Sequence, residues 1–134
     1  GLGDQFLDNL QIWRDQMALG LTTWAEMPEP SRSDCHAWGA SPNIEFYRIL
    51  LGIDSDAPGF RKIRIAPSLG KLKEVSGTIP HPLGSVTAAY KLDERGEGTA
   101  RLVLPEGTTG IFIWDGKEIP LKPGEQVISL SLRH

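Results

Sequence analysis

The sequence has little cysteine, no long apolar runs and little excess charge, and each shortage excludes a class of protein. A single cysteine excludes a scaffold built on disulfide bonds. The apolar runs are about as short as Ile49–Leu51, whereas a helix needs about 20 apolar residues to span a membrane. The formal net charge is −3, and no basic stripe carries interleaved aromatic residues. We therefore expect neither a membrane span nor a nucleic-acid partner.

What is present is the composition of an ordinary globular protein, 40% hydrophobic, with 15 glycines and 10 prolines in 134 residues. A chain of this length buries roughly two-thirds of its unfolded surface, which is enough for one core or two small ones. The chain has no initiator methionine and begins directly in a helical pattern. We therefore expect a piece of a longer protein, and a periplasmic or an extracellular location would suit that protein equally.

Two helices are predicted before residue 53. The first begins near Asp4 and ends at Gly20, because apolar residues recur every three or four positions along it. Its apolar stripe consists of Phe6, Leu10, Trp13 and Met17. The second helix begins at Ser41-Pro42, a good N-cap followed by a good first-turn residue, and ends at Gly52.

From residue 54 onward, short alternations of apolar and polar residues separated by turn residues predict β-strands. The predicted strands are 60–65, 72–79, 85–92, 98–104, 110–114, 117–121 and 126–132. Asp115-Gly116, between two of them, is a strong signal for a tight hairpin. Regularly spaced short strands predict an antiparallel sandwich or barrel, so we divide the chain into a helical segment, 1–53, and a β segment, 54–134.

The connection between the two predicted helices, residues 20–40, concentrates the residues with useful chemistry. Long irregular connections are usually functional or disordered, and the tryptophans and histidine of this one favour an ordered functional loop. It combines carboxylates with aromatic rings, namely Trp24, Glu26, Glu29, Asp34, His36 and Trp38. Aromatic rings stack on the apolar face of a pyranose, and carboxylates transfer the protons that glycoside cleavage requires. The loop therefore favours a sugar-cleaving site, although a loop glutamate taken alone is more often a solvated charge.

Other candidate groups point less clearly to chemistry. Cys35 has a histidine only as its sequence neighbour and lacks a third activating group, so we do not expect it to be a nucleophile. Trp114, beside the predicted hairpin, suits a sugar platform or packing on a sheet face, and packing is the commoner role. No histidine or cysteine spacing is typical of a metal site, so we expect no metal and no cofactor.

Four stretches of the sequence carry a resemblance to a known family. Three of them are residues 20–26 (Gly-Leu-Thr-Thr-Trp-Ala-Glu), 34–39 (Asp-Cys-His-Ala-Trp-Gly) and 46–53 (Phe-Tyr-Arg-Ile-Leu-Leu-Gly-Ile). The fourth is residues 59–67 (Gly-Phe-Arg-Lys-Ile-Arg-Ile-Ala-Pro). The first three resemble the end of the catalytic domain of bacterial α-L-rhamnosidases of glycoside hydrolase family 78. The fourth resembles the entry to the C-terminal β-sandwich of the same enzymes.

The resemblance implies an α+β fragment. Residues 1–53 would be the last helices and the active-site loop of an (α/α)6 six-hairpin barrel, and residues 54–134 a C-terminal antiparallel β-sandwich. It implies cleavage of terminal α-L-rhamnosides with inversion of the anomeric centre, with Glu26 as the general base that activates water. It also implies that His36, Trp24 and Trp38 bind the sugar. The general acid would lie upstream of Gly1, in other domains of the same parent chain, so we expect the fragment alone to be inactive.

Two other interpretations remain open at this point. One is a non-catalytic carbohydrate-binding or scaffolding module, in which the sandwich is the functional unit. The other is a different (α/α)6 glycosidase, which shares the end of the barrel but acts on another sugar.

Overall fold

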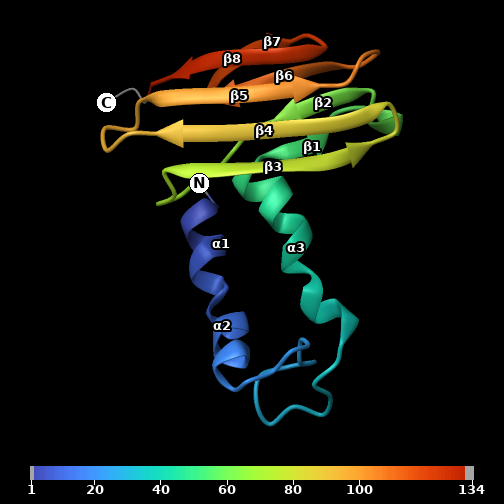
Figure 1. Cartoon of the computed structure of the whole chain (residues 1–134), viewed down its shortest axis with the longest axis vertical. Coiled ribbons are helices and arrows are strands. Elements are labelled where there is room, and N and C mark those ends of the chain that lie inside the picture. Colours follow the sequence, from blue (N-terminus) through green and yellow to red (C-terminus); the bar gives the residue numbers. More distant parts are fainter. Residues whose placement is uncertain (1, 132–134) are drawn as a thin grey trace.

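The computed structural model describes residues 2–131, which form two facing β-sheets with a pair of helical segments projecting from one side (Figure 1). The helical elements are α1 (Gly3–Asn9), α2 (Gln11–Ala18), α3 (Pro42–Glu45), the π-helical turn η2 (Phe46–Leu50) and the 3₁₀ turns η1 (Ala37–Ala40) and η3 (Pro58–Phe60). The first four strands are β1 (Ile53–Ser55), β2 (Lys62–Ile65), β3 (Glu74–His81) and β4 (Gly84–Leu92). The others are β5 (Gly98–Leu104), β6 (Thr109–Trp114), β7 (Lys117–Leu121) and β8 (Gly124–Leu130).

Each sheet contains four strands, in the order β1-β2-β6-β7 in one and β3-β4-β5-β8 in the other. All neighbouring strands are antiparallel except β2 and β6, which run parallel with Ile65 opposite Phe112. The prediction that all strands pair antiparallel is therefore wrong at this one pair. Hairpin signals identify neighbours that follow one another along the chain, whereas β2 and β6 are separated by three strands of the other sheet.

The seven strands predicted from the sequence are all present, with ends shifted by a few residues. The first of them begins at Lys62 rather than residue 60, because Pro58–Phe60 forms a 3₁₀ turn. The sequence does not predict β1, a three-residue strand whose short length gives no alternation to detect. It pairs with β2, so the first sheet begins at Ile53.

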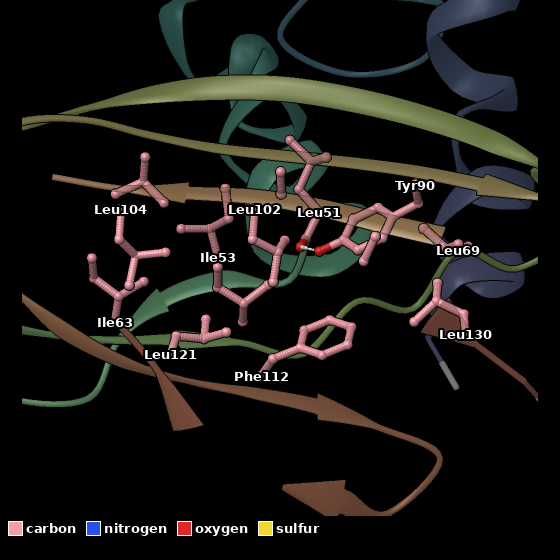
Figure 2. Packing of buried hydrophobic residues seen from close by; sticks show 14 residues of the cluster. Leu51, Ile53, Ile63, Leu69, Tyr90, Leu102, Leu104, Phe112, Leu121 and Leu130 are labelled. Carbon is pink, nitrogen blue, oxygen red and sulfur yellow. Dashed lines mark hydrogen bonds between the residues drawn. The ribbon is translucent and has the colours of Figure 1, made fainter. Parts of the chain in front are cut away.

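The core lies between the two sheets, where alternate residues of each strand point inward (Figure 2). Its buried members are Leu51, Ile53, Ile63, Ile65, Leu69, Val86, Ala88, Tyr90, Ala100, Leu102, Leu104, Phe112, Leu121 and Leu130. The hydroxyl of Tyr90 donates a 2.8 Å hydrogen bond to the carbonyl of Leu51. Burial raises the pKa of Tyr90, so the phenol stays protonated and remains a donor. This bond joins the end of the second helical segment to the sandwich.

The helical segments are more irregular than the sequence predicts. The first is interrupted at Leu10, which separates α1 from α2, and the second passes from a 3₁₀ turn through α3 into a π-helical turn. Pro42 occupies the first turn of α3 as expected, but Ser41 makes no capping hydrogen bond because its backbone is already helical after η1. Gly52 ends the segment at φ +71, where an added Cβ would lie 2.2 Å from the carbonyl carbon of Ala66.

The helical segments contact the sandwich at one end and project away from it at the other (Figure 1). The amide of Gly3 donates to Ser68 Oγ at 2.9 Å, and the amide of Ser68 donates to the carbonyl of Ile49 at 2.9 Å. The loop of residues 20–40 lies at the far end. Among residues 2–131, no helix is long and apolar enough to cross a bilayer.

Candidate active-site loop

Backbone hydrogen bonds fold the loop of residues 20–40 back on itself. The amide of Glu26 donates to the carbonyl of Ser33 at 2.8 Å, and the amide of His36 donates to the carbonyl of Trp24 at 2.8 Å. The indole of Trp38 adds a third link by donating to the carbonyl of Glu26 at 3.2 Å. The two stretches of the loop that contain the predicted site residues therefore lie side by side.

Glu26 combines a covered carboxylate with a single charged partner. Its side chain is 6% exposed, and both carboxylate oxygens are bound by Arg32. Arg32 Nε donates to Oε2 at 3.1 Å, and Arg32 Nη2 donates to Oε1. A carboxylate in this position is an ordered proton acceptor, which is what a general base requires.

His36 and Trp38 form an aromatic pair next to Glu26. Their ring centroids are 4.6 Å apart with the planes tilted by 41°. Trp38 is 62% exposed, so the pair offers an open ring surface. His36 Nδ1 is buried and has no hydrogen-bond partner among the described residues. The Trp38 indole bond to the backbone carbonyl of Glu26 links this aromatic pair to the segment that contains Glu26.

Trp24, the fourth predicted site residue, lies in a different environment. It lines an apolar groove of about 210 Å³ between the two helical segments. The other lining residues are Leu10, Trp13, Arg14, Met17, Gly39, Pro42, Asn43 and Phe46. Gly39 permits this packing, because an added Cβ there would lie 2.5 Å from the Cβ of Trp24. The groove contains the predicted apolar stripe from Leu10 to Met17 but neither Glu26 nor His36.

The remaining acidic residues of the loop, and its cysteine, have other surroundings. Glu29 is exposed and its Oε2 accepts a 3.3 Å hydrogen bond from the amide of Ser31, which stabilises the adjacent turn. Asp34 is exposed, and its backbone carbonyl accepts a hydrogen bond from Thr23 Oγ1. Cys35 is a free, exposed thiol. Among the residues that the structure describes, none of these side chains forms a hydrogen bond with the Glu26 carboxylate.

Two polar residues important to the loop are missed by the sequence analysis, Arg32 and Gln16. Gln16 is buried and its Oε1 accepts a 2.9 Å hydrogen bond from the amide of Ala25, which ties the loop to α2. It lies among polar helix residues with no feature to distinguish it. Arg32 does have a signal, since it is the sole Lys or Arg in a loop that holds Glu26, Glu29 and Asp34.

In the sandwich, Trp114 packs rather than forming an open platform. Its ring stacks on Phe112 with centroids 6.4 Å apart, and its indole donates to the carbonyl of Ser131 at 3.1 Å. It is partly buried against the core. Over residues 2–131, no group of three or more His, Cys, Asp or Glu side chains is arranged to hold a metal ion.

Three solved structures resemble this chain in fold. The first is an α-L-rhamnosidase from Aspergillus terreus, with 21% identity, a TM-score of 0.76, and coverage of 88% of this chain and 15% of that one. The second is an α-L-rhamnosidase from Dictyoglumus thermophilum, with 18% identity, a TM-score of 0.75, and coverage of 87% and 17%. The third is the Streptomyces avermitilis α-L-rhamnosidase complexed with L-rhamnose, with 20% identity, a TM-score of 0.66, and coverage of 79% and 12%.

This chain therefore spans less than a fifth of the length of each of these proteins. No curated protein sequence matches it. The family model of the bacterial alpha-L-rhamnosidase C-terminal domain matches residues 52–126, which include β1 to β7 and the first part of β8. The chain belongs to the bacterial α-L-rhamnosidase C-terminal domain family.

Proposed function

We propose that this chain is the C-terminal part of an inverting glycoside hydrolase, here called the parent enzyme, that cleaves terminal α-L-rhamnosides. In this proposal residues 1–53 are the last helices and active-site loop of an (α/α)6 barrel, and residues 54–134 are the β-sandwich that follows it. The observation that carries the proposal is the covered carboxylate of Glu26, a residue whose backbone carbonyl accepts the indole N–H of the His36–Trp38 pair, on a chain that matches a rhamnosidase domain model.

The apolar groove between the helical segments supports a barrel of which these residues are the end. Leu10 and Trp13 line the groove, and Met17 beside them is exposed. Apolar helix faces of this kind are normally covered by neighbouring helices. Upstream helices of the parent enzyme would cover them.

The proposed mechanism assigns one proton transfer to this chain. The Glu26 carboxylate accepts a proton from a water molecule as that water attacks the anomeric carbon on the face opposite the leaving group. Inverting enzymes place the general acid roughly 6.5–9.5 Å from the base, which leaves room for the water. Glu29 is directed into its own turn, so we assign the general acid to upstream domains.

The sugar would be bound by the aromatic residues of the loop. Trp38 offers an exposed ring for stacking, and His36, whose ring packs against it, is assigned to the same sugar. Trp24 would act from behind the loop, where its packing against Gly39 holds the segment that contains Trp38.

The function is tested by assaying the parent enzyme and this 134-residue chain side by side with an aryl α-L-rhamnoside. The parent enzyme is expected to release β-L-rhamnose first, detected by proton NMR before mutarotation. The isolated chain is expected to give no turnover, because the general acid lies outside it. Appreciable turnover by the isolated chain would show that the site is complete within these residues and contradict the domain assignment.

His36→Ala in the parent enzyme is expected to raise KM and lower kcat, each by about 10-fold, because a hydrogen bond to bound sugar acts in the ground state and in the transition state. Steady-state kinetics with the same aryl rhamnoside measures both parameters. Cys35→Ser is the matched control, since Cys35 is adjacent and exposed and its thiol makes no hydrogen bond in the described loop. Unchanged KM in His36→Ala would remove His36 from substrate binding.

A further inference from the structure

We propose that Arg32 is a positioning residue for Glu26, which orients the carboxylate so that one oxygen faces the attacking water. The inference rests on the proposed function, in which Glu26 is the general base. It assigns a role in the reaction to a residue that touches neither the water nor the sugar.

The first argument is the geometry of the contact. Arg32 binds both carboxylate oxygens of Glu26 through Nε and Nη2. The terminal torsion of a glutamate side chain is normally broad, so an unrestrained carboxylate samples many orientations. A planar guanidinium fork that holds both oxygens removes this freedom. Each oxygen has two lone pairs, and the fork engages one on each, which leaves lone pairs free to accept the proton of water.

The second argument is the contrast in burial. The Glu26 side chain is 6% exposed, whereas that of Arg32 is 74% exposed. A covered carboxylate is unfavourable unless it is paired. Within residues 2–131, Arg32 is the only side chain that bonds to this carboxylate, and its own outer face remains in solvent. Arg32 therefore pairs with the carboxylate and adds little to the packing of the loop.

The third argument is that the loop is built to present Arg32. The carbonyl of Ser33 accepts both the amide of Glu26 at 2.8 Å and Ser31 Oγ at 2.9 Å. These bonds close the turn on either side of Arg32 and set it opposite Glu26. Glu29, three residues before Arg32, accepts a hydrogen bond from the amide of Ser31, and within residues 2–131 no ion pair joins it to the guanidinium.

The test compares Arg32→Ala and Arg32→Lys in the parent enzyme. Arg32→Ala is expected to lower kcat by about 100-fold with KM little changed, because a misplacement of about 1 Å in a catalytic group costs that much. Arg32→Lys should recover part of the loss, since an ammonium is a point charge that cannot hold both oxygens in a plane. Free guanidinium, added at concentrations well below those that denature proteins, should raise the kcat of Arg32→Ala and leave that of Glu26→Gln unchanged.

Arg101→Ala is the matched control. Arg101 binds Glu125 through the same two nitrogens, Nε at 3.0 Å and Nη2 at 2.6 Å, but on β5 and β8 of the sandwich. The Arg101→Ala variant should have the same kcat as the parent enzyme, and added guanidinium should not change that kcat. A loss of kcat from Arg101→Ala similar to that from Arg32→Ala would show a general effect of removing surface ion pairs and overturn the inference.

The double variant Glu26→Gln/Arg32→Ala separates the two proposals. If Arg32 acts through Glu26, adding Arg32→Ala to Glu26→Gln lowers kcat no further. A lowered kcat in Glu26→Gln together with a wild-type kcat in Arg32→Ala would overturn the role of Arg32 and leave the proposed function intact. A wild-type kcat in Glu26→Gln would overturn the proposed function itself. Should Arg32→Ala fail to fold, Arg32→Lys keeps the charge, and wild-type kcat in that variant would equally contradict the need for a planar fork.

Discussion

Glu26→Gln in the parent enzyme is expected to lower kcat by about 10²–10⁴-fold with little change in KM, which is the usual contribution of a general base. The amide has the shape of the carboxylate but cannot accept a proton from water. Arg32 Nε donates to Oε2 of Glu26 at 3.1 Å. A glutamine can accept this bond only if its amide oxygen, and not its NH₂ group, takes the position of Oε2. Since the side chain is largely covered, the substitution should not alter the surface that binds the sugar.

The measurement is steady-state hydrolysis of an aryl α-L-rhamnoside, repeated with added azide. Azide attacks without a base, so it is expected to restore turnover in Glu26→Gln, whereas a variant of a merely structural glutamate would not respond. Glu29→Gln is the matched control, because Glu29 lies on the same loop and its carboxylate contacts only the nearby turn. A near-normal kcat in Glu26→Gln would remove Glu26 from the mechanism and direct attention to Glu29 and Asp34.

Phe112→Ala is expected to lower the free energy of unfolding of the 134-residue chain by about 3–5 kcal/mol, the usual cost of truncating a buried phenylalanine. Phe112 is fully buried on β6, between β2 and β7. Its ring stacks on Tyr90 of the opposite sheet and on Trp114, with both centroid distances at 6.4 Å. The cavity would therefore open at the contact between the two sheets.

Urea unfolding followed by tryptophan fluorescence measures this loss. Val127→Ala is the matched control, because Val127 is an exposed apolar residue on β8, and surface substitutions usually change stability by less than about 0.5 kcal/mol. Equal stability of the two variants would mean that the interface between the sheets is not the core on which the sandwich depends.

The sandwich and the loop have different parts in the proposed function. No described residue of β1 to β8 forms a hydrogen bond or ion pair with Glu26 or His36, and the loop lies at the end of the helical segments that is far from the sheets (Figure 1). The sandwich instead anchors these segments, through Tyr90 at Leu51 and through Ser68 at Gly3 and Ile49. It supports the site without contributing to it.

The sequence by itself determined the features that depend on local conformation. Asp115-Gly116 predicts the hairpin between β6 and β7, and both residues have the positive φ that a tight hairpin turn needs, 47° and 72°. Strand positions follow from alternation, since side chains on a strand point to opposite faces in turn. The loop was predicted as a candidate site because Glu26 and His36 are close in sequence, and the family resemblance is carried by the same local stretches.

The tertiary structure alone decided what depends on residues distant in sequence or on side-chain direction. β2 and β6 pair in parallel although three strands of the other sheet separate them along the chain, and no local pattern encodes such a pairing. Trp24 lines the groove, which Glu26 does not, and Gly39 leaves room for it there. Arg32 can pair with Glu26 because the loop closes through the bond between Glu26 and Ser33. The sequence shows only two opposite charges six residues apart and does not show that closure.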